Sequence, residues 1–171
     1  MRLEIFRTLW GYRGSWQQAL DEALGAGFDG LEARIPETAA QRAINARLLR
    51  EQNVPYIATL FTSTPVLPRQ SDSTQVHLED LRMKLDWAAE LGPRLVNVLP
   101  GNDRWALSEQ VDFFARAVEL ADASGLKVCF EIHRGRSLYS PWVTLDVIRQ
   151  VPELRFTSDI SHWLVTCERL L

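Results

Sequence analysis

Residues 129–163 read CFEIHRGRSLYSPWVTLDVIRQVPELRFTSDISHW, and this stretch decides the fold of the chain. Two short apolar runs, residues 126–133 and 154–161, enclose a helix-length segment that opens with Ser140 and Pro141. This order predicts a strand, a helix and a second strand. Strands that are joined through a helix lie parallel, so the stretch predicts a βαβ unit of a parallel sheet.

The two predicted strands carry polar side chains toward their carboxyl ends. Side chains alternate between the faces of a strand, so Glu131 shares a face with His133, while Phe130 points to the other side. Active sites of parallel α/β proteins lie at the carboxyl ends of the strands, because the βα loops open there. The polar side chains of both strands are therefore expected to converge. They are Glu131, His133, Asp159 and His162.

The rest of the chain repeats this alternation of short apolar runs and helix-length segments. Four earlier runs are predicted strands, at residues 3–10, 28–35, 56–62 and 94–99. With the two later runs, and with a last helix predicted over residues 163–171, they make six βα units. Strict βα alternation is typical of a parallel α/β fold.

Two parallel architectures fit six βα units. A (β/α)₈ barrel takes about 250 residues. This chain has 171 residues, so its length alone favours an open doubly wound sheet such as that of a flavodoxin-like binding module. The first βα turn, residues 10–14, reads WGYRG, which is neither a P-loop nor GxGxxG. The phosphate-binding motif that usually marks the open sheet is therefore missing.

Composition excludes several classes of function. Hydrophobic residues make up 46% of the chain and charged residues 24%, which fits one globular domain. A net charge of -3 gives no basic surface for nucleic acid or for an anionic membrane. The two cysteines provide no disulfide framework, and the first residues lack the apolar segment of a signal peptide. These features predict a cytoplasmic protein.

Several segments resemble the sugar phosphate isomerase/epimerase group of xylose isomerase-like TIM barrels. They are FEIHRGR at residues 130–136, SPW at 140–142, SDISHW at 158–163, FDGLE at 28–32 and VNVLPG at 96–101. The resemblance implies a TIM (β/α) barrel of this type that is incomplete, with about six of the eight βα units. Residues 1–171 would then form a single partial barrel domain without the last two units.

The resemblance also implies roles for particular residues. In that family the glutamate that ends strand five and the aspartate that ends strand six bind a divalent metal; they match Glu131 and Asp159. The strand-five glutamate also acts as a base, which makes Glu131 the expected catalytic residue. His162 matches a histidine that contacts substrate, and His133 and Arg134 lie in the same motif and are expected to contact it too. The family's remaining ligands, a histidine on strand seven and a glutamate on strand eight, have no counterpart here.

The implied chemistry moves a proton between adjacent carbons of a sugar or sugar phosphate through an enediolate. A divalent ion such as Mn, Co, Mg or Zn polarises the carbonyl, and carboxylates carry the proton. Arg134 or Arg136 is expected to hold a phosphate or carboxylate of the substrate. The alternatives are a dehydratase of a polyol ketone, and a non-catalytic barrel fragment that associates with a complementing chain.

Other residues carry open expectations. Glu32 is predicted either to form an ion pair with an arginine or to belong to the site, and Asn97 to fill the interior with a hydrogen bond. His77, beside the apolar stripe of its helix, is expected at the surface. The carboxylates of Glu131 and Asp159 are expected within shared-ligand distance, with weak metal binding. Unpaired edge strands predict self-association.

Overall fold

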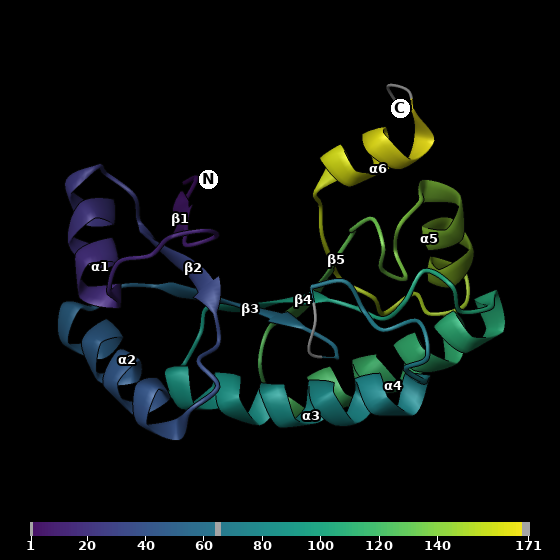
Figure 1. The fold of residues 1–171 in the computed structure, drawn as a ribbon, viewed down its shortest axis with the longest axis horizontal. Coiled ribbons are helices and arrows are strands. Elements are labelled where there is room, and N and C mark those ends of the chain that lie inside the picture. Colours follow the sequence, from purple (N-terminus) through teal and green to yellow (C-terminus); the bar gives the residue numbers. More distant parts are fainter. Residues whose placement is uncertain (1, 64–65, 169–171) are drawn as a thin grey trace.

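The computed structural model describes residues 2–63 and 66–168. Within these residues strands and helices alternate along the chain (Figure 1). The strands are β1 (Phe6–Thr8), β2 (Gly30–Arg34), β3 (Tyr56–Phe61), β4 (Leu95–Leu99), β5 (Val128–Glu131) and β6 (Phe156–Thr157). The helices are α1 (Trp16–Gly25), α2 (Ala39–Gln52), α3 (Thr74–Leu91), α4 (Leu107–Ser124), α5 (Pro141–Ile148) and α6 (Ile160–Cys167). None of the described helices is long and apolar enough to cross a membrane.

The six strands form one parallel sheet in the order β1-β2-β3-β4-β5-β6. Each strand therefore pairs with its neighbours in the chain, whereas the strand order of a doubly wound sheet reverses at a switch point. Sequential order belongs to a barrel, so the open doubly wound alternative is wrong. The prediction of an incomplete barrel with parallel βα units is confirmed: the described residues form six strands and six helices in a half-barrel.

The hydrophobic core lies between the sheet and the helices. Side chains on one sheet face are almost completely buried, among them Leu31, Ala58, Val96, Val98 and Phe130. Helix residues such as Leu20, Leu81, Phe113 and Phe114 are part of the same cluster. In Figure 1, α2, α3 and α4 run along this side of the sheet, and α6 lies beyond the far end of β5. The opposite face of the sheet carries the polar residues that alternate with these apolar ones along the strands. A functional site can therefore form on this face.

Strand β6 is shorter than the sequence predicts. Residues 154–161 were expected to form a strand, but only Phe156 and Thr157 pair with β5. The reason is that Asp159 begins α6: its side chain accepts a hydrogen bond from the Ser161 backbone N–H at 3.1 Å. An aspartate at this position caps a helix. Helix α6 consequently starts at Ile160, earlier than expected, and residues 169–171 of the predicted helix lie outside the described residues.

The surface position expected for His77 is wrong, because its side chain is fully buried. Its ring packs edge-on against Trp105 at 4.8 Å, and Nδ1 is 2.8 Å from the Thr62 hydroxyl. Burial lowers the pKa of His77 to about 4, so the imidazole is neutral. Trp105 follows β4 and covers the histidine from the next βα unit. His77 is therefore a core residue that joins two units.

The edges of the sheet lead to an expectation about assembly. Strands β1 and β6 each pair with a single neighbour in the described part of the chain. The exposed apolar side chains near these strands include Ile5 at 52%, Ile160 at 56% and Val165 at 56%. Unpaired backbone groups beside apolar side chains favour pairing with another chain. We expect the average mass from light scattering to rise with protein concentration, and a concentration-independent monomer mass would contradict this expectation.

Candidate metal and substrate site

The polar face of the sheet lines a cleft of about 1330 Å³. Its walls include residues from every strand or from the loop that follows it, as expected for the carboxyl ends of parallel strands. The predicted site residues Glu131, His133, Arg134, Asp159 and His162 all lie along this cleft. The structure thus brings the predicted residues to one place, although they do not all contact one another.

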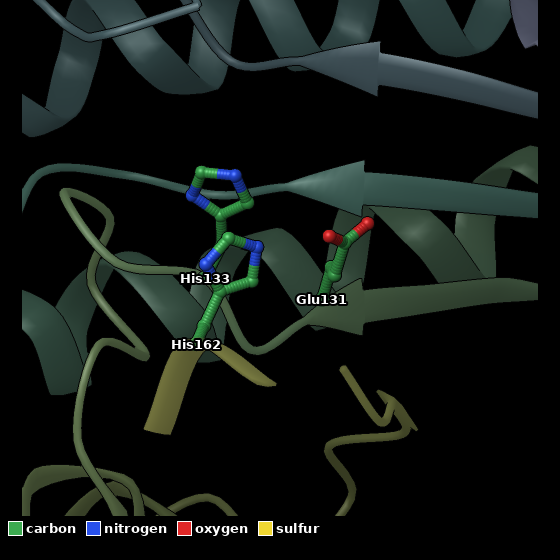
Figure 2. A group of neighbouring side chains, drawn as sticks. All are labelled: Glu131, His133 and His162. Atoms are coloured by element: carbon green, nitrogen blue, oxygen red, sulfur yellow. The ribbon is translucent and has the colours of Figure 1, made fainter. Parts of the chain in front are cut away.

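Three of the predicted residues form a compact cluster: Glu131, His133 and His162 (Figure 2). One ligand atom of each lies within 4.8 Å of the others. Glu131 is the last residue of β5, and His133 follows two residues later. His162 comes from the first turn of α6, and the centroids of the two imidazole rings are 3.8 Å apart. Segments from two neighbouring βα units therefore build the cluster.

The environment sets the protonation of these groups. Burial raises the pKa of Glu131 to about 7; the hydrogen bond from Asn97 opposes this, and the negative charge of Asp159 adds to it. Burial and the neighbouring His162 lower the pKa of His133 to about 4. Burial also lowers the pKa of His162. At neutral pH the cluster thus holds two neutral imidazoles and a carboxyl group that exchanges its proton readily.

The cluster fits a divalent metal ion. Neutral imidazole nitrogens and a carboxylate oxygen are the donors of catalytic zinc sites and also suit other borderline cations. His133 Nδ1 lies 2.5 Å from the Arg134 carbonyl oxygen, a contact that fixes the ring and leaves Nε2 as the ligand atom. His162 Nδ1 is buried and has no hydrogen-bond partner among the described residues. A buried nitrogen without a partner is what a metal ion would satisfy.

Asp159 lies beside the cluster and is not a member of it. One carboxylate oxygen accepts from Ser161 at the start of α6, and the other is 3.5 Å from His162 Nε2. Its charge still raises the pKa of Glu131, so it is near enough to act electrostatically. The sequence predicted that the carboxylates of Glu131 and Asp159 would lie close enough to share a metal ion, but the cluster joins Glu131 to two histidines instead. Metal ligation by Asp159 stays a prediction.

The structure adds two residues to the site that the sequence left open. Asn97 donates from Nδ2 to Glu131 at 2.5 Å and to Glu32 at 3.5 Å. Glu32 also accepts from the Thr59 hydroxyl at 3.1 Å. Asn97 thereby connects two carboxylates from different strands. The sequence does carry a signal for both residues. Glu32 and Asn97 are each a polar residue between two apolar neighbours in a strand, so each points to the face opposite the core.

The two arginines that were expected to hold an anion, Arg134 and Arg136, differ in their exposure to solvent. Arg134 is exposed at the edge of the cleft. Arg136 is fully buried and donates to the backbone carbonyl oxygens of Thr62 at 2.8 Å and Val66 at 2.5 Å. Arg136 does not line the cleft. The expectation that Arg136 binds a substrate anion is therefore wrong, because its guanidinium donates hydrogen bonds to backbone carbonyl oxygens of a neighbouring loop.

Comparison with known proteins settles the family. A profile described as xylose isomerase-like TIM barrel matches residues 20–169. The chain belongs to this family. A search of curated proteins found no significant match. As a xylose isomerase-like protein, the chain is expected to carry its site where the cleft lies, at the carboxyl ends of the strands.

Solved structures with the xylose isomerase-like fold include a dehydratase and an epimerase. The probable 3-DHS dehydratase AsbF from Bacillus anthracis matches with a TM-score of 0.73 at 14% identity, over 96% of this chain and 66% of its own. The D-allulose 3-epimerase from Methylomonas sp., in complex with D-allulose, matches with a TM-score of 0.66 at 20% identity, over 88% and 59%. The IOLI protein, solved with a zinc atom, matches with a TM-score of 0.64 at 12% identity, over 88% and 59%. The chain thus spans about two thirds or less of these proteins.

Proposed function

We propose that this protein is a metal-dependent sugar or sugar phosphate isomerase or epimerase that moves a proton between adjacent carbons. The observation that carries the proposal is the cluster of Glu131, His133 and His162 at the mouth of a xylose isomerase-like sheet. It combines donors for a divalent ion with a carboxyl group that can act as a general base.

Within this proposal each residue has a distinct task. Glu131, His133 and His162 hold the ion, with Asp159 beside them as a further candidate ligand. When bound, the ion supplies polarisation of the substrate carbonyl, which makes the neighbouring C–H acidic. Glu131 takes this proton and returns it to the adjacent carbon or to the other face of the same carbon.

Two neighbours of Glu131 support this transfer. Asn97 holds the Glu131 carboxyl group in position through its 2.5 Å hydrogen bond. Arg134, at the rim of the cleft, contacts the substrate, as its place in the motif predicts. His133 and His162 were predicted as substrate contacts. Because one nitrogen of each histidine lies within 4.8 Å of a carboxylate oxygen of Glu131, both histidines are better placed to bind the metal ion.

A dehydratase is the second candidate. It begins with the same proton abstraction next to a carbonyl, and the structure of the probable 3-DHS dehydratase shares the fold. The two candidates differ in the next step, because a dehydratase expels a hydroxyl group and releases water. A non-catalytic fragment that completes a barrel with another chain is the third.

The test is exchange of substrate hydrogen with solvent. Purified protein is incubated in D₂O with Mn²⁺ and a panel of ketoses, ketose phosphates and polyol ketones. Proton NMR then follows loss of the C–H signal next to the carbonyl. Exchange with a new sugar supports an isomerase or epimerase, exchange with an unsaturated product supports a dehydratase, and a complete lack of exchange supports the non-catalytic fragment.

Metal affinity is expected to depend on pH through Glu131. A carboxyl group must lose its proton to bind a cation, and the pKa of Glu131 is raised to about 7. The apparent affinity for Mn²⁺ should therefore fall about tenfold per pH unit below that pKa and level off above it. His133, with a pKa of about 4, adds no proton competition in this range. Calorimetry between pH 5.5 and 8 measures the effect.

Glu131→Gln provides the control for this titration, because the amide has no proton to lose. The variant should bind Mn²⁺ more weakly at pH 8 and should show a nearly flat affinity between pH 5.5 and 8. Affinity of the unaltered protein that does not change over the same range would show that Glu131 is not a ligand. Tight stoichiometric binding would contradict the expectation of a weak site.

A further inference from the structure

Arg34 occupies an unusual place at the rim of the cleft. It is the last residue of β2 and lies two residues after Glu32, so both side chains are on the cleft side of the sheet. Its guanidinium carbon lies 4.8 Å from the centre of the Trp10 ring and 4.6 Å from that of Phe61. The two rings are themselves 6.2 Å apart and tilted, so together they form a support for the cation.

The guanidinium of Arg34 has no hydrogen-bond acceptor within the described part of the chain. Among residues 2–63 and 66–168, no carboxylate pairs with Arg34, and no side chain or carbonyl accepts from its guanidinium. Other arginines do have such partners: Arg42 pairs with Glu90 at 2.8 Å, and Arg7 pairs with Glu22 at 2.7 Å. Aromatic rings hold a guanidinium by its flat face and leave the N–H groups at its edge available.

The position of Arg34 suits one end of a small substrate. In the strand register Arg34 lies beside Thr59, and Thr59 lies beside Asn97, which in turn bonds Glu131. A ligand anchored at Arg34 can therefore extend across β3 and β4 toward the carboxyl group of Glu131. The other side chains of the cleft near this line are acidic or neutral, with Glu32 the closest in sequence. A cation held in place by aromatic rings gives this part of the cleft an anchor for a negative group.

We propose that Arg34 binds an anionic group of the substrate, a phosphate or a carboxylate, and that the site therefore selects anionic sugars over neutral ones. That the ligand is a sugar rests on the proposed function; the preference for an anion rests on Arg34 itself. A guanidinium binds either group through two parallel N–H bonds. Arg34, rather than the buried Arg136, would then be the residue that sets the substrate class.

Binding of matched pairs tests the proposal. The first pair is D-fructose and D-fructose 6-phosphate, and the second is D-glucose and D-glucuronate. Calorimetry without added metal measures their dissociation constants, so that contact of the anion with a metal ion does not contribute. We expect at least one anionic member to bind about tenfold more tightly than its neutral partner, as charge-assisted hydrogen bonds predict. A difference in the fructose pair indicates a phosphate site, and a difference in the glucose and glucuronate pair indicates a carboxylate site.

Variants assign the preference to Arg34. Arg34→Gln should reduce binding of the anion to that of the neutral sugar, whereas Arg34→Lys should keep part of the preference because the positive charge remains. Arg47→Gln is the matched control, since Arg47 is an exposed arginine of α2 that pairs with Glu51, and neither residue lines the cleft. It should change nothing. Equal affinity within both pairs, no binding at all, or a preference that survives in Arg34→Gln would overturn the proposal.

The two proposals fail in different ways. If the anion preference depends on Arg34 but the protein exchanges no substrate hydrogen, the proposed function is wrong and the anion site stands. If hydrogen exchange occurs equally with neutral and anionic sugars, the function stands and the anion site is wrong. Glu131→Gln separates them further, because it should lose exchange while it keeps the Arg34-dependent preference.

Discussion

Glu131→Gln is expected to reduce the exchange of substrate hydrogen with solvent by about 10²–10⁴-fold, the usual contribution of a positioned general base. The amide keeps the size of the side chain and a hydrogen-bonding group for Asn97, but it cannot accept a proton from carbon. The measurement is the initial rate of deuterium incorporation by NMR with the best substrate of the panel. Glu153→Gln, at an exposed glutamate, is the matched control and should leave the rate unchanged.

The loss of exchange in Glu131→Gln will not reflect unfolding. The pKa of Glu131 in the folded chain, about 7, lies above its usual value of 4.5. The folded state therefore binds this proton more tightly than the unfolded state, and the associated stability is present at low pH and lost as the pH rises through 7. Gln has no such loss, so the variant should melt no lower than the unaltered protein at pH 8. A variant that exchanges hydrogen normally would remove Glu131 from the mechanism.

Arg136→Met is expected to lower the free energy of unfolding by about 1–3 kcal/mol, the cost of leaving a buried hydrogen-bond acceptor without its donor. Burial lowers the pKa of Arg136 to about 10, so it is still charged at neutral pH. Its guanidinium donates to the carbonyl oxygens of Thr62 at 2.8 Å, Val66 at 2.5 Å and Gly101 at 3.3 Å. Methionine fills similar space but leaves these acceptors without donors.

Urea unfolding followed by circular dichroism measures the effect of Arg136→Met. Arg134→Met is the control, because the two arginines are two positions apart in one loop but Arg134 is exposed. An exposed substitution changes stability by about 0.5 kcal/mol or less. Similar losses in both variants would contradict the view that Arg136 ties the loops after β3, β4 and β5 together.

The fold and part of the site follow from local patterns in the sequence. Alternation of apolar runs with helix-length segments predicted the parallel βα units. The period of two along a strand placed Glu131 with His133, and the structure finds them in one cluster. Strand order could not come from such patterns, because both parallel architectures share them. The resemblance at residues 130–136 and 158–163 supported the barrel instead.

The predictions that failed involve contacts between distant segments or competing local structures. His77 is buried because Thr62 and Trp105 meet it from two other loops, which no helical pattern reveals. The apolar residues around Asp159 suggest a strand, but its carboxylate finds a backbone N–H two residues later and begins a helix. Helix capping and strand pairing compete for the same few residues there, and capping is favoured.

The sequential strand order has a consequence for synthesis of the protein. Each strand pairs with the one made just before it, so its partner has already left the ribosome when the strand emerges. A nascent chain can therefore add one βα unit at a time to an existing edge, and each of the described strands from β2 to β6 finds its earlier partner already translated. Because each new pairing closes only a single βα loop, the entropy lost at each addition is small.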